Sequence, residues 1–310
     1  MNPLLKNKKQ NKLLIILGPT AVGKSNIAVR LARKYNGEVI SADSRQVYKG
    51  LDIGTGKITH AEMEGIPHHL LDVAETRERF TVTKWKELTT NAIRDIHSRN
   101  RLPIICGGTG YYIQALVYDI DYPEVPNDIE EQARLEKQSP EDLYIILQKL
   151  DQDRASTIDR MNKRRLSRAI LIARKLGKVP VIDTTPKQTV DSKSDYKLVG
   201  ITLPIDELRV RIHNRLVSRI DAGMIDEAKK LNENGLSYER MNELGLEYRY
   251  EAQYLQGQIT KEGMIEKLDI EISHYAKRQM TWFKRDKNID WYAPDQLEII
   301  ETSIKKYLLE

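Results

Sequence analysis

The feature that most constrains the fold is a short glycine-bounded segment, residues 18–25, which fits the pattern Gly-x-x-x-x-Gly-Lys-Ser/Thr. An apolar run, residues 13–17, precedes it, and Ile27, Leu31 and Tyr35 follow at helical spacing. A strand, a glycine loop and a helix in this order form the context in which the pattern binds phosphate groups. We call residues 18–25 the phosphate loop, and we predict that all of them bind a diphosphate: Gly18, Pro19, Thr20, Ala21, Val22, Gly23, Lys24 and Ser25.

Two side chains of the phosphate loop carry its chemistry. Backbone N–H groups and the helix N-terminus favour an anion, and Lys24 adds a full positive charge. The Ser25 hydroxyl is the expected ligand of Mg²⁺, directly or through water, so Mg²⁺ is the predicted cofactor. The pattern predicts pyrophosphate binding and does not identify ATP as the ligand.

The rest of the apolar pattern predicts a parallel sheet. Short strands are expected at residues 37–43, 102–106 and 198–203, with a helix between the first two that carries Trp85, Leu88, Ala92 and Ile96. Alternating strands and helices are typical of an α/β fold whose parallel sheet is covered by helices. The expected core therefore resembles that of P-loop NTPases. Later stripes at helical spacing, such as Met264, Leu268, Ile272 and Tyr275, are interpreted as core packing.

The pattern changes between residues 118 and 194, where helical stretches and loops occur without an apolar strand. Residues 183–195 are polar and predict a loop. We expect an all-helical domain, residues 118–194, inserted into an α/β core made of residues 1–117 and 195–310. No internal repeat is recognisable.

Composition excludes several classes of protein. The chain has 310 residues, 40% of them hydrophobic, so it can bury a core. One Cys excludes a disulfide framework and a cysteine-based zinc site, and suits a reducing cytosol. No apolar run approaches the roughly 18 residues that a membrane-spanning helix needs. The apolar run 13–17 is too short for a signal peptide, so a cytoplasmic protein without a membrane partner is expected.

Polar groups follow two of the predicted strands. Asp43 ends the second strand, and Gly107-Gly108-Thr109-Gly110 follows the third. Functional groups collect beyond the carboxyl ends of parallel strands. Asp43 could act as a general base, hold the metal in the manner of a P-loop ATPase, or cap a helix. Thr109 could likewise be only a helix cap.

At these residues the sequence resembles the tRNA dimethylallyltransferase (isopentenyltransferase) family. The matching segments occur in family order between about residue 13 and residue 285: residues 18–25, 41–48, 51–55, 65–70, 107–110, 164–169, 211–215 and 276–283. The resemblance implies transfer of a dimethylallyl group from dimethylallyl diphosphate to the 6-amino group of adenosine 37, beside the tRNA anticodon. It also implies that Asp43 is the general base, that Thr109 donates a hydrogen bond to the diphosphate, and that Arg215 pairs with the diphosphate.

The basic clusters fit an RNA partner. Residues 154–178 contain nine basic residues and one acid, a larger excess than the +5 of the whole chain. The usual alternative for such a run is a solvated helical face. A second basic and partly aromatic cluster lies near the C-terminus and comprises His274, Lys277, Arg278, Trp282, Lys284 and Arg285. Trp282 could equally belong to the core. By resemblance we expect the tRNA contacts to be Asp43, Ser44, Arg45, Gln46, Lys163, Arg164, Arg165, Arg168, Lys277, Arg278, Gln279 and Trp282.

The sequence departs from the family pattern at several positions. Gly56 and Ile58 replace the usual Ala and Pro, and Tyr111 replaces a Leu. Arg219 stands where Met is common, and residues 244–248 match the family's Ile-Gly-Tyr segment only in part. The zinc finger of eukaryotic relatives is absent.

Two other functions compete with the transferase. A P-loop small-molecule kinase would explain the first 50 residues, but it leaves the basic insertion and residues 277–283 unexplained. A non-catalytic RNA-binding protein would leave Asp43 and Thr109 without a role. We expect the transferase to act as a monomer.

Overall fold

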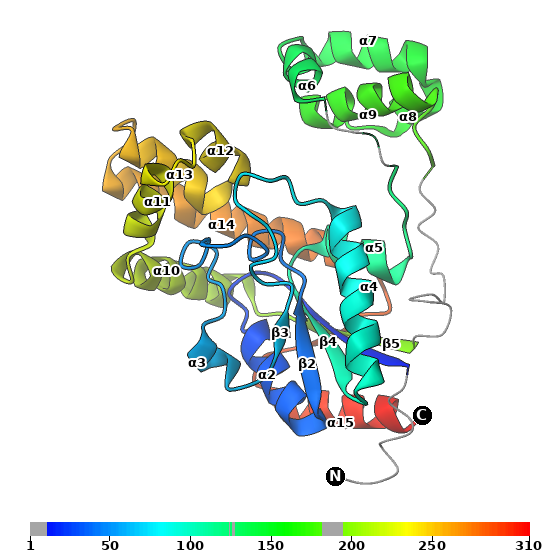
Figure 1. The fold of residues 1–310 in the computed structure, drawn as a ribbon, viewed down its shortest axis with the longest axis vertical. Coiled ribbons are helices and arrows are strands. Elements are labelled where there is room, and N and C mark those ends of the chain that lie inside the picture. The colour runs from blue at the N-terminus through cyan, green and yellow to red at the C-terminus, as the bar shows by residue number, and fades with distance from the viewer. Residues whose placement is uncertain (1–10, 124, 126–127, 182–194) are drawn as a thin grey trace. The chain divides into compact units, whose positions relative to one another are not determined.

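The computed structural model describes residues 11–123, 125, 128–181 and 195–310. Its sheet has six parallel strands in the order β3-β2-β4-β1-β5-β6 (Figure 1). The strands are β1 (Lys12–Leu17), β2 (Gly37–Ser41), β3 (His68–His69), β4 (Leu102–Gly107), β5 (Asp195–Ile201) and β6 (Asp290–Tyr292). The predicted α/β class with a parallel sheet is confirmed. Two of the strands, β3 and β6, were not predicted.

Helices connect and cover these strands. In the part of the chain containing the sheet they are α2 (Lys24–Tyr35), α3 (His60–Met63), α4 (Val82–Ser98), α5 (Gly110–Val117), α10 (Ile205–Asp221), α11 (Met224–Glu233), α12 (Tyr238–Leu244), α13 (Leu246–Leu255), α14 (Lys261–Phe283) and α15 (Leu297–Leu309). Gly223, at a φ of +96°, separates α10 from α11, because glycine adopts this left-handed conformation at little cost.

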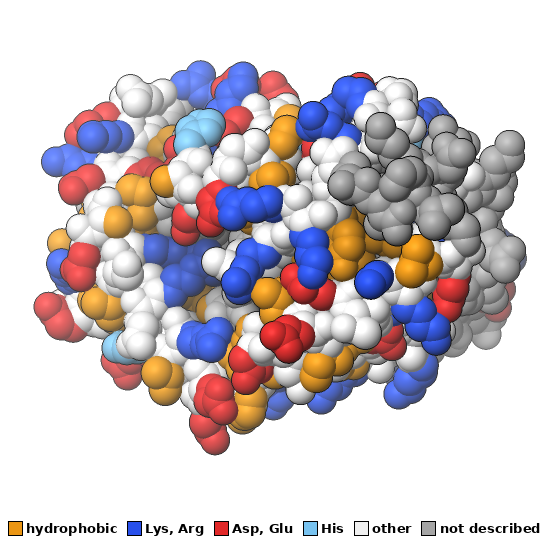
Figure 2. Space-filling view, turned by 90° about the horizontal axis from the view of Figure 1, so that it is seen from below, with side chains coloured by type: hydrophobic (Ala, Val, Ile, Leu, Met, Phe, Trp, Pro, Cys, Tyr) orange, Lys and Arg blue, Asp and Glu red, His pale blue; other side chains and the backbone are white. Residues whose placement is uncertain are grey.

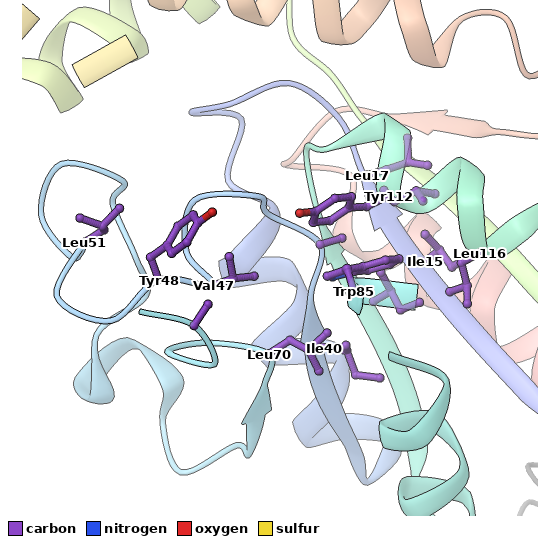
Figure 3. Packing of buried hydrophobic residues seen from close by; sticks show 14 of the residues in the cluster. Ile15, Leu17, Ile40, Val47, Tyr48, Leu51, Leu70, Trp85, Tyr112 and Leu116 are labelled. Atoms are coloured by element: carbon purple, nitrogen blue, oxygen red, sulfur yellow. The ribbon is translucent and has the colours of Figure 1, made fainter. Parts of the chain in front are cut away.

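Successive residues of the central strands bury their side chains on opposite faces of the sheet. Leu13, Ile15 and Leu17 of β1 pack with side chains of α4 and α5, such as Trp85 and Tyr112, whose rings stack at 4.8 Å (Figure 3). Leu14 and Ile16 pack in a second cluster with apolar residues of α2, α10, α14 and α15. Since both faces are covered, the strands consist of continuous apolar runs.

The chain divides into two compact units, Met1–Asp119 with Pro186–Glu310, and Ile120–Thr185. The second unit contains α6 (Ile129–Glu136), α7 (Pro140–Leu150), α8 (Gln152–Thr157) and α9 (Lys163–Leu176). These helices have their own core, which includes Leu143, Leu147, Leu166 and Ile170. The predicted polar loop, residues 183–195, lies outside the described residues except for Asp195, which begins β5.

Charged side chains of both signs are interspersed on the face that Figure 2 displays. This mixture agrees with a chain that has 50 Lys and Arg against 45 Asp and Glu. Among the described residues, no helix combines the length and the apolar character that crossing a membrane requires.

Candidate active site

Three neighbouring strands end at one edge of the sheet, and each delivers predicted site residues there. The order β2-β4-β1 places the segment after β2, which contains Asp43, beside the segment after β4, which contains Thr109. The phosphate loop follows β1, the next strand. Carboxyl ends of adjacent parallel strands form the usual binding edge of such sheets. The candidate site is therefore assembled by strand order from segments far apart in the sequence.

The phosphate loop turns tightly before α2. Ala21 and Gly23 both have positive φ, +62° and +95°, and Gly23 occupies the N-cap position of α2. The Lys24 ammonium donates a hydrogen bond of 2.6 Å to the Pro19 carbonyl, so it lies back across the loop. Ser25 is exposed on the first turn of α2. Lys24 and Ser25 thus both lie at the N-terminus of α2.

The pKa of Lys24 is shifted strongly by its surroundings. Burial lowers the pKa of its ammonium to about 8, Arg215 lowers it further, and Cys106 and Asp43 act in the opposite direction. Asp43 follows β2, Cys106 lies in β4, and Arg215 lies in α10, so the Lys24 side chain is close to all three of these elements. At neutral pH the ammonium stays charged and weakly solvated, which strengthens its interaction with an anion.

Asp43 serves the local fold with one of its two oxygens. Its Oδ1 accepts hydrogen bonds from the backbone N–H groups of Arg45 (2.8 Å) and Gln46 (3.3 Å). Within the described residues Oδ2 has no hydrogen-bond partner, and the side chain is only partly buried. The cap-like role is therefore real, but it leaves Oδ2 available to a substrate.

Thr109 occupies the N-cap position of α5 but makes no capping hydrogen bond with its side chain. Its Oγ1 instead accepts from the Ser44 N–H at 3.0 Å and is hydrogen-bonded with the Tyr275 hydroxyl. Its backbone N–H donates to the Ala42 carbonyl at 3.1 Å. Thr109 therefore joins the ends of β2 and β4 to α14, which the helix-cap alternative does not explain.

Arg215 faces the site. Its guanidinium donates a hydrogen bond of 3.1 Å to the Gly56 carbonyl, which also accepts from the Gln46 side chain at 3.2 Å. Burial and the neighbouring Arg219 lower the pKa of Arg215 to about 10, whereas Glu247 and Asp43 raise it. Arg215 is therefore half-buried and interacts electrostatically with Asp43, unlike an isolated charge on the surface. It remains protonated at neutral pH.

Gln279 has a position that differs from the tRNA contact predicted for it. The side chain is 6% exposed. Its Oε1 accepts from the Thr20 N–H at 2.9 Å, and its Nε2 donates to the Gly108 carbonyl at 2.8 Å. Gln279 thus holds the phosphate loop to the end of β4, and this arrangement gives no support to a direct contact with RNA.

Of the remaining predicted contacts on α14, two are at the surface and one is half-buried. Lys277 and Arg278 are exposed, and the Arg278 guanidinium lies 6.0 Å from the centre of the Tyr275 ring. Trp282 is half-buried: it packs edge-on to Tyr111 at 6.5 Å. Trp282 therefore contributes to packing, as one of the two alternatives stated.

In the helical unit, the predicted contacts lie at the beginning of α9. Asn162 caps this helix, and Arg164 and Arg165 are exposed on its first turn. Arg168 donates a hydrogen bond of 2.7 Å to the Val125 carbonyl, so part of its guanidinium is used inside the unit. Arg164 and Arg165 are therefore more accessible to an RNA phosphate than Arg168 is.

The donor set of the site fits a Mg²⁺ ion that is held mostly by its ligand. Ser25 offers one hydroxyl at the start of α2. In the described part of the chain, no three His, Cys, Asp or Glu side chains gather in a way that could hold a metal ion. Mg²⁺ is commonly bound by one or two protein groups together with substrate phosphates and water, so the residues present suffice.

The roles of three residues at the site were not predicted from the sequence. Tyr275 was assigned to core packing, Gln279 to RNA, and Cys106 to a strand. The Cys106 thiol hydrogen-bonds with Ser25, and burial raises its pKa to about 11. In the sequence, Tyr275 is only the last of four apolar residues at helical spacing. That pattern predicts a buried helix face, but it does not show which of its residues lies at a functional site.

Comparison with known proteins identifies the family of this chain. Residues 46–286 match the family model described as IPP transferase. The tRNA dimethylallyltransferase of Anoxybacillus flavithermus is 40% identical over 299 residues, which cover 96% of this chain and 95% of the relative. That of Halalkalibacterium halodurans is 38% identical over 288 residues, 91% of each chain.

Solved structures give the same result. The tRNA isopentenylpyrophosphate transferase of Bacillus halodurans superposes with a TM-score of 0.72 at 36% identity, covering 96% of this chain and 97% of that one. A eukaryotic dimethylallyltransferase that acts on tRNA gives 0.75 at 30% identity, with 91% and 73% coverage. With a family model that matches most of its length and relatives that align nearly end to end, this chain belongs to the tRNA dimethylallyltransferase family.

Proposed function

We propose that this protein transfers the dimethylallyl group of dimethylallyl diphosphate to the N6 amine of adenosine 37 in the anticodon loop of tRNA. One observation carries the proposal: the phosphate loop and the Asp43 carboxylate lie at the ends of nearby strands, with Thr109 between them and Lys24 within electrostatic reach of Asp43. A diphosphate in the loop would direct its allylic carbon toward the carboxylate.

The reaction needs a base because the adenine amine is a poor nucleophile. Its lone pair is delocalised into the ring, and a carboxylate within hydrogen-bond reach can orient the amine and take its proton. The free Oδ2 of Asp43 suits this role, while Oδ1 is fixed by the backbone. The N6–carbon bond forms, the carbon–oxygen bond to the diphosphate breaks, and Asp43 accepts the proton. The target base must leave its stack to reach this carboxylate.

The leaving diphosphate requires positive charge where its own charge develops. The N–H groups of the phosphate loop, Lys24 and Arg215 supply it, and Thr109 contributes a hydroxyl at the adjacent strand end. Bound Mg²⁺, held by Ser25 and the diphosphate, would neutralise further charge. We include Mg²⁺, tRNA and the allylic diphosphate as the ligands, and we propose a monomer that works in the cytoplasm, where tRNA is modified.

A small-molecule kinase is the second candidate, because the phosphate loop alone would serve it. The carboxylate that holds the metal in a typical P-loop ATPase follows a later strand, whereas β4 ends in Cys106 and Gly107. The arrangement of Asp43 with Thr109 favours the transferase.

The test uses purified protein with Mg²⁺, labelled dimethylallyl diphosphate and an unmodified tRNA that carries adenosines at positions 36, 37 and 38. We expect the label in the tRNA, and none in a transcript with guanosine at position 37. ATP turnover without label transfer would instead support the kinase.

A further inference from the structure

In the loop that follows Tyr48, side chains bind both the N–H groups and the carbonyl groups of the backbone. We call residues 51–57 the clamped loop. The N–H groups of Asp52, Ile53 and Gly54 donate to the Glu227 carboxylate at 3.1, 2.7 and 3.0 Å. The Tyr248 hydroxyl donates to the same carboxylate at 2.8 Å. A charged acceptor that gathers three backbone donors fixes the path of the loop.

The carbonyl groups of the clamped loop face two guanidinium groups of α10. Arg219 donates to the Gly54 carbonyl at 3.2 Å and to the Thr55 carbonyl at 3.3 Å. Arg215, one helical turn earlier, donates to the next carbonyl, that of Gly56. Gly56 has a φ of +58°, and a Cβ there would lie 1.9 Å from Arg219 and 2.4 Å from Arg215. Glycine therefore lets both guanidinium groups approach the same turn.

Arg219 is anchored from its other side by Glu247 of α13. The two side chains form an ion pair at 3.2 Å, and they are only 12% and 14% exposed. Arg219 and the segment 244–248, which contains Glu247, are two places at which the sequence departs from the pattern it resembles. The structure joins them: an apolar residue at 219 would leave Glu247 as a buried, unpaired carboxylate and would remove the donors from two carbonyl groups.

The Arg219–Glu247 pair also affects the charge around Arg215. Two guanidinium groups one turn apart repel each other, and Arg219 lowers the pKa of Arg215 while Glu247 raises it. Glu251 lies wholly buried nearby, and burial, Glu247 and Glu227 raise its pKa well above the ordinary value, which favours its neutral form. Burial raises the pKa of Glu247 as well, whereas Arg219 and Arg215 lower it, so pairing with Arg219 favours the charged form of Glu247.

We propose that Arg219 and Glu247 are positioning residues for the diphosphate donor. Arg219, anchored by Glu247, fixes the Gly54 and Thr55 carbonyls, and the adjoining Gly56 carbonyl then sets the orientation of the Arg215 guanidinium. Gln46, bound to the same Gly56 carbonyl, is held by the same turn. This inference rests on the proposed function, in which Arg215 pairs with the diphosphate.

The experiment measures the affinity of the full-length protein for inorganic pyrophosphate by calorimetry, together with kcat and the KM of each substrate. For Arg219→Met we expect affinity for pyrophosphate to fall about tenfold and the KM of the allylic diphosphate to rise comparably, with a smaller rise in the KM of tRNA because Gln46 is held by the same turn. Arg219→Lys should not restore affinity, because one ammonium cannot span the carbonyls and the carboxylate as a guanidinium does. Arg209→Met, at an exposed position of α10, is the matched control.

Glu247→Gln separates positioning from plain electrostatics. If Glu247 acted only through its charge, its removal would strengthen pyrophosphate binding. A positioning role predicts weaker binding, because Arg219 loses its anchor. The double variant Arg219→Met/Glu247→Gln should bind no worse than Arg219→Met alone, because the unpaired carboxylate is gone.

Three results would overturn the proposal: pyrophosphate affinity within about twofold of the unmodified protein in Arg219→Met, full recovery in Arg219→Lys, or tighter binding in Glu247→Gln. Should Arg219→Met fail to fold, Glu247→Gln decides alone. Pyrophosphate affinity does not depend on prenyl transfer, so a wild-type protein that binds pyrophosphate without modifying tRNA would refute the proposed function and leave this result interpretable.

Discussion

At the scale of single residues, the Asp43 carboxylate divides its two oxygens between the fold and the site. Oδ1 accepts two backbone hydrogen bonds, and Oδ2 is left for a substrate. A substitution to Ala removes both, so it mixes damage to the turn with loss of the base. Asn keeps an acceptor for the turn but cannot take a proton at neutral pH.

We predict that Asp43→Asn lowers the single-turnover rate of prenyl transfer by about 10²- to 10⁴-fold, the usual range for loss of a general base. The dissociation constant of the tRNA should stay within about twofold, because the turn is preserved. Rapid-quench kinetics and a filter-binding titration measure the two quantities. Equal losses in rate and affinity would show that Asp43 positions the tRNA and is not the base.

At the scale of elements, Glu38 links β2 to its neighbours. This wholly buried carboxylate receives hydrogen bonds from Arg99 at the end of α4, from Arg101 just before β4 at 2.6 Å, and from His69 of β3 at 2.7 Å. Burial raises the pKa of Glu38, but the bonds from Arg99, His69 and Arg101 outweigh it and lower the pKa to about 2.

Glu38→Gln should therefore reduce the free energy of unfolding by about 3 kcal/mol at neutral pH, since the basic side chains lose their buried partner. Because the folded-state pKa lies below the ordinary value of 4.5, the stabilisation is complete above pH 4.5 and disappears as the pH falls toward 2. Urea unfolding at several pH values tests this.

The control for that experiment is Glu87→Gln, which removes an exposed ion pair with Lys84 and should change stability by less than about 1 kcal/mol. A difference between Glu38→Gln and the unmodified protein that persists undiminished at pH 2.5 would contradict the assignment of the lowered pKa to Glu38.

The same elements show how far sequence reasoning reaches. Strands β1, β4 and the second half of β5 are buried on both faces, and their apolar runs predicted them. Strand β2 was also predicted, although Val39 and Ile40 are its only adjacent apolar residues. Strand β3, His68–His69, pairs with β2 over two residues and is polar, and β6 spans only three residues. Segments this short carry no periodicity, and only the neighbouring strand gives them an extended conformation.

The site divides in a similar way. The phosphate loop, Asp43 and Thr109 follow strands directly, so their place was predictable from local pattern. Gln279 hydrogen-bonds with Thr20 and with Gly108, and it is more than 150 positions away from each of them in the chain. The pairing of Arg219 with Glu247 is equally hard to predict from the sequence, where Arg219 is an isolated departure and Glu247 belongs to a segment that matches the family only in part.

At the scale of the whole molecule, one stretch of the helical unit, residues 154–178, carries nine basic residues against one acid. The stretch 154–178 belongs to the helical unit, and Arg164 and Arg165 are exposed at the start of α9. Contacts of such side chains with RNA phosphates release counterions, so affinity falls as salt rises.

Replacing Arg164 and Arg165 together by Ala should weaken tRNA binding and reduce the slope of log affinity against log salt by roughly 1.5, the loss of about two phosphate contacts. Lys229→Ala with Lys230→Ala removes the same charge from exposed positions of α11 and is the matched control. An unchanged slope in the Arg variant, or the same reduction in both, would remove α9 from the RNA-binding surface.

The measurement that tests the central claim most directly is nucleoside mass spectrometry of the tRNA after reaction, with released diphosphate counted in parallel. The account predicts one dimethylallyl group on N6 of adenosine 37 for each diphosphate released. Diphosphate released without a modified nucleoside, or a dimethylallyl group found on another base, would contradict it.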